Sequence, residues 1–593
     1  MKYPTLTEMQ VSRDWVDAFG GYNHNLRISG AEFYEMKNMT GDDYPTLSPR
    51  RRRGIYWSKE ENTNINGIIA KNGLCWVADG KLYVNGSAIE NDTNFSLSNS
   101  SKQLISMGAY LIILPDKMYI NTDNPEDKGK IESKFTAEKA TLEMTMLDTG
   151  NFGEVRKGIT PPKDEEIKID IDNGKVPIWI DTSKKPNVLK IYSTSNETWS
   201  QASTTYTKIS AQEIHSYFEV GDGVEISGLS ENEEHLNGYT TVASKGDNYI
   251  VIMGLISEVL NNQSITVQRT MPDMDFVIES GNRLWGCRYF EKDKDGNPVK
   301  ALNEIYACKL GDFKNWRSYQ GTAMDSYAVT VGTDGEFTGA ATHLGYPIFF
   351  KENCMHKIYG NYPSNYQVQT TTCRGVQKGC EKSIATVNEV LYYKSRSAVC
   401  AYDGSLPIEI SSALGDVVYS NAIAGALGNK YYISMRDSKE TPHLFVYDTK
   451  KGMWHKEDNT DISAFENCRG DLYFISKDTN QIITVGGTGV LDLNPVEWEV
   501  ITGTMGTDSP DKKYISKIDV RMLLEVGSRV SFYVEYDSSG EWEHLFNMDG
   551  RSLKSFSVPV RPKRCDHMRL RIIGKGEAKI YSICKSVEWG SDK

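Results

Sequence analysis

Short apolar and aromatic strands recur along this chain in units of similar length, and this repeat constrains the fold more than any other feature. Four units begin near residues 340, 384, 423 and 462, at intervals of 44, 39 and 39 residues. Each unit holds two or three strand-like runs joined by turns. Asp-Gly between two apolar runs, as at Asp79 and Gly80, is a strong hairpin signal. Repeats of about 40 residues built from short strands are typical of propeller blades.

Seven such units occur, and we predict one blade from each. They lie at residues 68–84, 104–120, 276–319 and 340–359, and in stretches that begin at 384, 423 and 462. A single four-stranded blade cannot bury both of its faces, whereas a closed ring of blades buries them and removes the terminal edges. The 50 Gly and 33 Tyr of the chain suit tight turns and half-buried strands. We therefore predict an all-β fold with a β-propeller of about seven blades over residues 55–128 and 272–489.

Two further β domains are predicted beside the propeller. The second and third units are separated by residues 129–271, where alternating strands joined by Gly turns at 218–226, 236–242 and 249–253 indicate an inserted small β-barrel or sandwich. The last segment, 490–593, contains clean two-residue alternation, for example at 515–521 and 529–536. That alternation is typical of sheets with one wet face, so we predict a C-terminal β-sandwich.

The first segment, residues 1–54, is polar and rich in Gly and lacks periodicity, so we predict an extended N-terminal arm. It carries spaced aromatic side chains and ends in a run of four arginines. Extended arms with spaced aromatics commonly become ordered on a partner, where charge pairs set the register. We therefore interpret these residues as an assembly arm that contacts an acidic partner subunit: Trp15, Phe19, Tyr22, Phe33, Tyr34, Tyr44, Arg50, Arg51, Arg52 and Arg53.

Chemical motifs are scarce. The chain has no phosphate-binding loop, no HExxH zinc motif and no GxSxG nucleophile elbow, and its nine His occur singly. The acidic pairs lie in charged, turn-like stretches, and the ten Cys are scattered within apolar strands, where reduced thiols are the rule. We therefore expect no catalytic residue, no cofactor, no metal site and no enzymatic activity. The net charge of −12 argues against sequence-specific DNA binding but is compatible with a wall past which DNA slides.

Several segments resemble one family. Residues 35–54, 80–83, 282–285, 347–359 and 390–407 are similar to the opening, first-blade, middle-blade and late-blade segments of nozzle and hub proteins, also called stabilisation proteins, from the tails of short-tailed bacteriophages. The resemblance implies a structural virion protein that forms a homo-oligomeric ring around the DNA channel and helps to retain and then pass the genome. The expected partners are portal-adaptor or other tail subunits, genomic DNA without sequence recognition, and the host surface.

The resemblance also implies synthesis in the host cytoplasm, and the sequence shows neither a secretory signal nor an apolar run of transmembrane length. The alternative is a receptor-binding or glycan-binding propeller adhesin of the phage tail, and a glycoside hydrolase is a third class. Glycan stacking on Trp57, Trp316, Trp454 or Trp542 competes with ordinary strand packing, which we favour for each.

Overall fold

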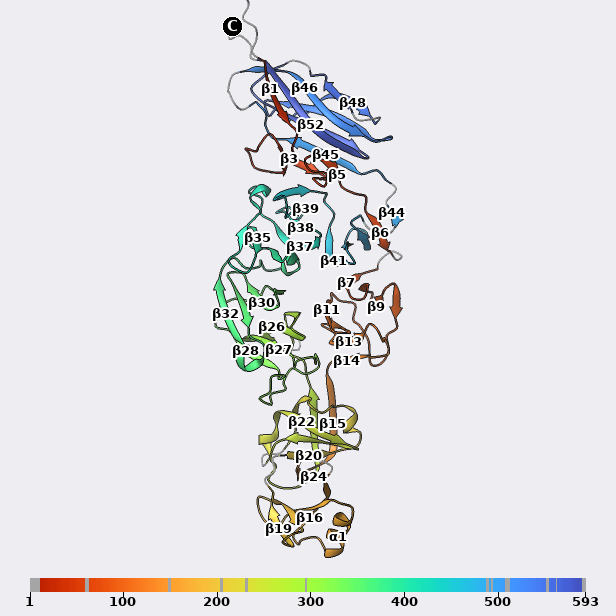
Figure 1. Cartoon of the computed structure of the whole chain (residues 1–593), viewed down its shortest axis with the longest axis vertical. Coiled ribbons are helices and arrows are strands. Elements are labelled where there is room, and N and C mark those ends of the chain that lie inside the picture. The colour runs from red at the N-terminus through yellow and green to blue at the C-terminus, as the bar shows by residue number, and fades with distance from the viewer. Residues whose placement is uncertain are drawn as a thin grey trace, which may run out of the picture.

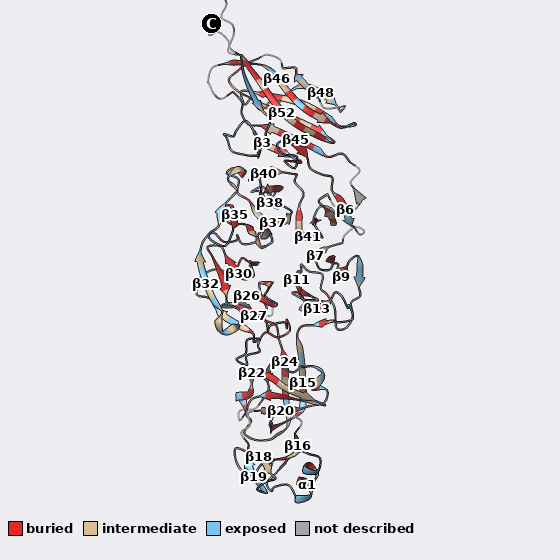
Figure 2. Ribbon diagram, viewed as in Figure 1, coloured by how far each residue is buried: buried red, intermediate tan, exposed pale blue. Residues whose placement is uncertain are grey.

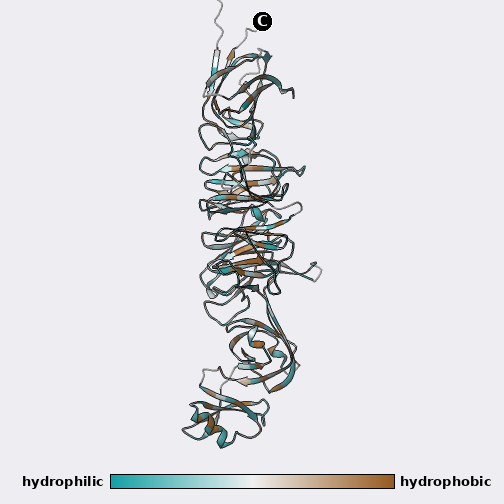
Figure 3. Ribbon diagram, turned by 90° about the vertical axis from the view of Figure 1, so that its right-hand side faces the viewer, coloured by the Kyte–Doolittle hydropathy of each residue, from teal (hydrophilic) through white to brown (hydrophobic). Residues whose placement is uncertain are grey.

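The computed structural model arranges four modules in a line (Figure 1). A β-sandwich lies at one end, a propeller follows, and a small barrel and a four-stranded sheet with a helix lie at the other end. Figure 3, turned by 90°, shows the modules still in line. The structure describes residues 11–58, 63–147, 151–202, 206–229, 233–293, 296–486, 490–491, 494–506, 512–550, 554–560 and 563–588.

Within these residues, six four-stranded antiparallel sheets and one five-stranded sheet follow one another around a ring, which confirms the predicted all-β propeller. The first two blades are β7 (Ile65–Ala70), β8 (Leu74–Ala78), β9 (Lys81–Val84) and β10 (Ser87–Ile89), then β11 (Gln103–Met107), β12 (Tyr110–Leu114), β13 (Met118–Asn121) and β14 (Lys128–Lys130). The third and fourth are β25 (Phe276–Ser280), β26 (Arg283–Lys292), β27 (Pro298–Ala307) and β28 (Tyr327–Thr330), then β29 (Gly339–His343), β30 (Tyr346–Lys351), β31 (Cys354–Tyr359) and β32 (Gln367–Thr372).

The last three blades complete the ring. The fifth and sixth are β33 (Ala385–Val387), β34 (Val390–Lys394), β35 (Val399–Tyr402) and β36 (Ile408–Glu409), then β37 (Ser420–Leu427), β38 (Lys430–Arg436), β39 (Pro442–Asp448) and β40 (Met453–Lys456). The seventh is β41 (Ile462–Cys468), β42 (Asp471–Ser476), β43 (Gln481–Thr484) and β6 (Gly54–Trp57), with β44 (Val490–Leu491) at its edge. The fourth strand of the last blade thus comes from the N-terminal part of the chain.

That strand closes the ring. In β6, Gly54 pairs with Thr484 and Ile55 with Ile483, both in antiparallel register. The innermost strands of the first and last blades, β7 and β41, lie side by side. Because the last blade contains strands from both ends of the propeller segment, backbone hydrogen bonds between β6 and β43 hold the ring closed.

The insertion between the second and third blades contains two modules. A closed barrel is formed by β15 (Ser133–Thr145), β20 (Tyr206–Ser210), β21 (Gly223–Ser227), β22 (Gly238–Gly246), β23 (Tyr249–Met253) and β24 (Leu260–Arg269). Between β15 and β20 the chain forms a mixed sheet of β16 (Phe152–Gly158), β17 (Val176–Asp181), β18 (Val188–Ser193) and β19 (Thr198–Gln201), with helix α1 (Asp164–Asp172). Ser133 pairs with Arg269, so the entry and exit of the insertion are adjacent.

The end module is a two-sheet sandwich. One sheet contains β1 (Val11–Val16), β46 (Lys513–Leu524), β49 (Lys554–Val558), β50 (Arg564–Cys565) and β52 (Ala578–Glu588). The other contains β2 (Gly21–Tyr22), β3 (Glu32–Lys37), β45 (Glu497–Thr502), β47 (Arg529–Tyr536), β48 (Glu543–Asp549) and β51 (Met568–Lys575). Along β46, buried residues alternate with partly exposed ones as the sequence pattern predicts.

The prediction of an extended arm is wrong for the described residues. Strand β1 pairs with β52 along its whole length, β3 pairs with β45, and a short hairpin of β4 (Met39–Thr40) and β5 (Ser48–Pro49) follows. The segment from residue 11 to residue 50 is therefore part of the sandwich. Its strands are short and obtain their partners from the other end of the chain, so no local periodicity marks them. Residues 1–10 of the predicted arm lie outside the described residues.

One continuous hydrophobic core joins the sandwich to the propeller (Figure 2). It contains Phe532 and Ile572 of the sandwich, Phe33 of the N-terminal segment, and Tyr431 and Phe445 of the sixth blade, all buried. The two modules do not have separate cores with a wet interface between them. Relative motion of domains is expected where few apolar contacts cross an interface, and here buried apolar side chains of both modules pack in one cluster.

Candidate functional site

Of the ten residues predicted to form an assembly arm, some are buried within the chain and others are exposed. Phe19, Tyr22 and Phe33 are buried in the shared core, with 4 %, 3 % and 2 % of their surface exposed. Trp15 and Tyr44 are 50 % and 46 % exposed, and Tyr34 stacks on the ring of His24. The buried three are covered by this chain itself and are not available to a partner. The assembly role of the exposed ones stays a prediction.

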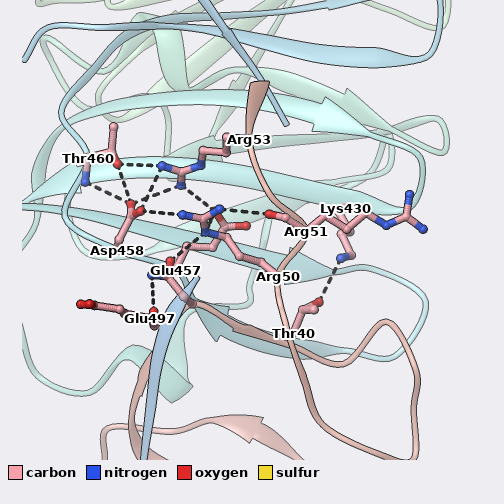
Figure 4. A network of polar contacts seen from close by, with 10 residues as sticks. Thr40, Arg50, Arg51, Arg53, Lys430, Glu457, Asp458, Thr460 and Glu497 are labelled. Atoms are coloured by element: carbon pink, nitrogen blue, oxygen red, sulfur yellow. Dashed lines mark hydrogen bonds and ion pairs between the residues drawn. The ribbon is translucent and has the colours of Figure 1, made fainter. Parts of the chain in front are cut away.

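The arginine run forms an ion-pair network with the loop after β40 (Figure 4). Arg53 Nη2 lies 2.8 Å from Glu457 Oε2, and Arg53 Nη1 lies 3.0 Å from Asp458 Oδ2. Arg50 Nη2 lies 3.4 Å from the same Asp458 oxygen. Burial raises the pKa of Asp458, but the charges of Arg53 and Arg50 outweigh it and lower the pKa to about 2. Two of the predicted arginines are thus paired within the chain.

Of the other two arginines, Arg51 is exposed and Arg52 is partly buried. The network of Arg50 and Arg53 lies directly before β6, the strand that closes the propeller, and it joins that strand to the loop between the sixth and seventh blades. Its position indicates that it fixes the N-terminal segment against the ring. The sequence predicted charge pairing here but placed the acidic partner in another subunit.

A shallow groove at the rim of the third and fourth blades is a candidate binding site. It encloses about 600 Å³, within the range of about 300–1,000 Å³ that is usual for ligand sites. Its walls are two surface loops, one between β27 and β28 and one between β31 and β32 (Figure 1). Tyr319 and Tyr362, 52 % and 43 % exposed, stand on the two loops, and Tyr327 lines the groove between them.

The first loop is held from inside by a buried carboxylate. Asp325, 5 % exposed, accepts hydrogen bonds from the backbone amides of Gln320 and Gly321, both at 2.6 Å, and from that of Thr322 at 3.1 Å. Thr322 Oγ1 also donates to Asp325 Oδ1 at 2.6 Å. Burial raises the pKa of Asp325, and these hydrogen bonds more than offset that effect, so the pKa lies below its ordinary value.

A buried guanidinium holds the same loop from the other side. Arg283, 1 % exposed, donates to the carbonyl oxygens of Cys308 at 2.7 Å, Asp325 at 2.6 Å and Ala323 at 2.9 Å. A buried charge is costly, and hydrogen bonds lower that cost; the two terminal nitrogens of Arg283 are bonded, whereas its buried Nε has no partner. Here that charge is used to fix the backbone of an exposed loop, so the loop conformation is set before any ligand arrives.

The second loop has its own clamp. Asn365 Oδ1 accepts hydrogen bonds from the backbone amides of Asn361 at 3.0 Å and Tyr362 at 3.1 Å. Behind both loops, the rings of Trp285, Tyr327 and Tyr366 pack edge to face, with Tyr366 centred 5.0 Å from each of the other two. Of these three rings only Tyr327 lines the groove, and the other two pack against it from behind.

Two other hollows open near the propeller. Where the inner strands begin, adjoining cavities of about 410 and 520 Å³ are both lined by Lys102, Gln103 and Lys382. Burial lowers the pKa of the Lys382 ammonium, which donates to the Ser463 carbonyl oxygen at 3.2 Å.

Among the described residues, no three His, Cys, Asp or Glu side chains are placed to hold a metal ion.

A larger hollow, of about 1,130 Å³, lies across the fourth to sixth blades. The buried Lys394 and the surface ion pair of Arg374 with Glu409, at 2.9 Å, line it. Lys394 Nζ donates to Gln377 Oε1 at 3.1 Å, so its charge is already used within the chain.

Within the described part of the chain, no helix has the length and apolar character needed to span a bilayer.

Of the four tryptophans weighed for glycan stacking, Trp57 and Trp542 are partly exposed and the other two are buried. Trp316 and Trp454 are buried, at 1 % and 2 % exposure, as the preferred packing interpretation predicts for them. Tyr319 and Tyr362 were not singled out, because a tyrosine in a loop and a tyrosine in a strand look alike in the sequence. The one available signal was the gathering of Tyr in turn-like segments of neighbouring blade units.

Comparisons with known proteins add the following. No protein-family model and no curated protein matches the chain. Among solved structures, an exo-β-1,3-galactanase from Phanerochaete chrysosporium is 8 % identical and covers 52 % of this chain and 94 % of its own, with a TM-score of 0.22. A Trypanosoma rangeli sialidase mutant with trans-sialidase activity is 8 % identical and covers 90 % of this chain and 96 % of its own, with a TM-score of 0.25.

A third similar structure is a family 43 arabinoxylan arabinofuranohydrolase from Bacillus subtilis, at 8 % identity over 52 % of this chain and 94 % of its own, with a TM-score of 0.18. These three neighbours are carbohydrate-active enzymes. The expectation that this chain has no enzymatic activity is corrected by that finding and is withdrawn. At such identities the likeness concerns the fold, and it transfers no activity to this chain.

Proposed function

We propose that the chain is a structural subunit of a bacteriophage tail, a nozzle or hub protein whose copies stand side by side in a ring around the DNA channel. The observation that carries the proposal is the arrangement of the modules in one elongated line (Figures 1 and 3), with apolar, ionic and hydrogen-bond contacts at the junctions of the propeller. A ring subunit that must retain pressurised DNA needs connections between modules that do not bend.

The junction with the sandwich supports this requirement. The shared core and the network of Arg50 and Arg53 with Glu457 and Asp458 join the sandwich, the N-terminal segment and the sixth blade. Asn38 adds a hydrogen bond from its backbone amide to the Glu457 carbonyl oxygen at 2.7 Å. Because apolar packing and buried ion pairs act at the same junction, the sandwich cannot swing without exposing both.

The junction with the inserted barrel is built in a similar way. Asp222 of the barrel pairs with Arg269, and its Oδ1 accepts a hydrogen bond from Asn315 Nδ2 of the third blade at 3.0 Å. The same Asn315 accepts from the Gly223 amide at 2.8 Å. A Cβ at position 223 would lie 2.5 Å from the carbonyl oxygen of Arg317, so the backbones meet where only glycine fits.

The free side of the fourth blade offers a contact between copies. Its outermost strand, β32, is six residues long, carries no charge, and exposes Gln367, Gln369, Thr370 and Thr372. Soluble proteins usually protect such edges with Lys, Pro, bulges or short length. In the proposed ring, a neighbouring copy covers this edge.

Electron cryo-microscopy of purified phage particles tests the proposal. We expect density for a seven-bladed propeller repeated around the tail axis, with the sandwich and the barrel at opposite ends of each copy. Particles that contain the tail but lack this chain, or a chain found only on the host cell surface, would contradict it.

A variant makes the same test on the contact between copies. Adding charge to the edge by changing both Gln369 and Thr372 to Lys should leave the isolated protein folded and sharply reduce its incorporation into particles. The matched control is Gln201→Lys, an equally exposed position on the edge strand β19 of the insertion. Normal incorporation of the β32 variant would rule out this edge as the contact.

A further inference from the structure

We infer that the groove between the third and fourth blades, lined by Tyr319, Tyr327 and Tyr362, is a binding site for a neutral carbohydrate chain. The inference does not depend on where the chain is assembled. None of the residues that line the groove belongs to the hydrophobic core that joins the propeller to the sandwich.

Exposed tyrosines on clamped loops are the first reason. Tyr319 and Tyr362 keep about half of their surface open to solvent although each stands on a loop whose backbone is held by side-chain hydrogen bonds, to Asp325 in the first loop and to Asn365 in the second. Tyrosine has few rotatable bonds, so holding it on a rigid loop leaves little entropy to be lost on binding.

The buried groups that hold the loop are the second reason. The carboxylate of Asp325 and the guanidinium of Arg283 are both nearly inaccessible, and both use their hydrogen bonds on the loop that carries Tyr319. Two buried charged side chains thus hold the backbone of one surface loop. Such a supporting shell is what a preformed site requires.

The lining decides the ligand class. Aromatic rings, the hydroxyls of Thr322 and Ser364, and backbone groups line the groove, and the carboxylate of Asp325 is its sole charged side chain among the described residues. That carboxylate is already bound by four donors. A nucleic acid would call for Lys or Arg along the walls. A sugar ring offers apolar C–H faces to stack on the rings and hydroxyl edges for the polar groups.

The test is direct binding of the full-length protein to an array of neutral tetra- to hexasaccharides built from glucose, mannose, galactose or xylose. The best-bound oligosaccharide then enters calorimetric titration with variants. Tyr319→Ala and Tyr362→Ala should each weaken binding by about tenfold or more, as expected for aromatic anchors. Tyr319→Phe should weaken it much less, because the stacking ring remains.

Controls separate this site from general effects. Tyr217→Ala removes a tyrosine of the inserted barrel that is also 43 % exposed, and it should leave binding unchanged. Binding should also be insensitive to salt, since the groove presents no unpaired charge. Three outcomes would overturn the inference: no array member is bound by folded protein, the Tyr217 variant loses as much affinity as the groove variants, or a proline-rich peptide binds the groove and the oligosaccharides do not.

Discussion

The ion pairs before β6 provide a quantitative test of how the propeller is closed. The variant Asp458→Asn removes the carboxylate that lies between Arg50 and Arg53, whose side chains are 15 % and 12 % exposed. The pKa of Asp458 falls from 3.8 to about 2 in the fold. At about 1.4 kcal/mol per pKa unit, the charged form is stabilised by about 2–3 kcal/mol. Breaking a buried pair costs about 3–5 kcal/mol, so we expect a loss near 3 kcal/mol.

The loss should appear where the network acts. Hydrogen exchange of the peptide that contains Gly54–Trp57 reports the opening of β6 from the last blade. A loss of about 3 kcal/mol corresponds to roughly hundredfold faster exchange. Because the folded pKa of Asp458 is depressed, its stabilisation is complete above the unfolded value and is lost as pH falls through the folded value. The difference between variant and wild type should therefore shrink from about pH 5 toward pH 2.

The control is Arg51→Ser, at the exposed member of the same arginine run. It should leave exchange of the β6 peptide unchanged. If the β6 peptide exchanges as slowly at neutral pH in Asp458→Asn as in this control, the network is not what holds the closing strand. The backbone pairing of β6 with β43 would then suffice by itself.

Four further outcomes are expected. Gly574→Ala should lower the melting temperature of the sandwich, at a cost of about 1–3 kcal/mol, because a Cβ there would lie 2.0 Å from the ring of Trp498; tryptophan fluorescence measures it. Burial lowers the pKa of His455 to about 4, so stability should fall as pH drops from about 6.5 to 4, and the melting temperature of His455→Phe should depend less on pH. Replacing residues 132–270 by a short Gly/Ser linker should leave the blades folded, as judged by hydrogen exchange, because the two ends lie beside each other. Non-reducing electrophoresis of fresh protein should match the reduced pattern, because all ten thiols are free and nine are buried.

The blade repeat was predictable because it is local. Within each blade, antiparallel strands are joined by short turns, and the alternation in runs such as Lys81–Val84 reflects which face of the strand is buried. The same holds for β46 and β47 of the sandwich. Position in the repeat also located the insertion, since neighbouring blades must follow one another at similar spacing.

The closing strand could not be predicted in this way. Gly54–Trp57 is four residues long and pairs with residues more than 400 positions later in the chain. The nearby strand Val11–Val16 likewise pairs with the last strand of the sandwich. Strands this short carry no periodic signal of their own, and their propensity depends on the partner that covers them. Their absence from the sequence-based prediction produced the incorrect extended arm.

By itself, the sequence determined an all-β chain with seven blade-sized repeats, one interruption and a separate C-terminal sheet region. These features were readable because apolar and polar residues alternate along the strands according to which face is buried. Only the tertiary structure decided that Arg53 pairs with Asp458, that Phe33 belongs to a core shared by two modules, and that Tyr319 and Tyr362 face one groove. These are relations between residues far apart in the chain. The residue type limits which interactions a side chain can make. Its actual partner and its exposure depend on which distant segment the fold brings against it.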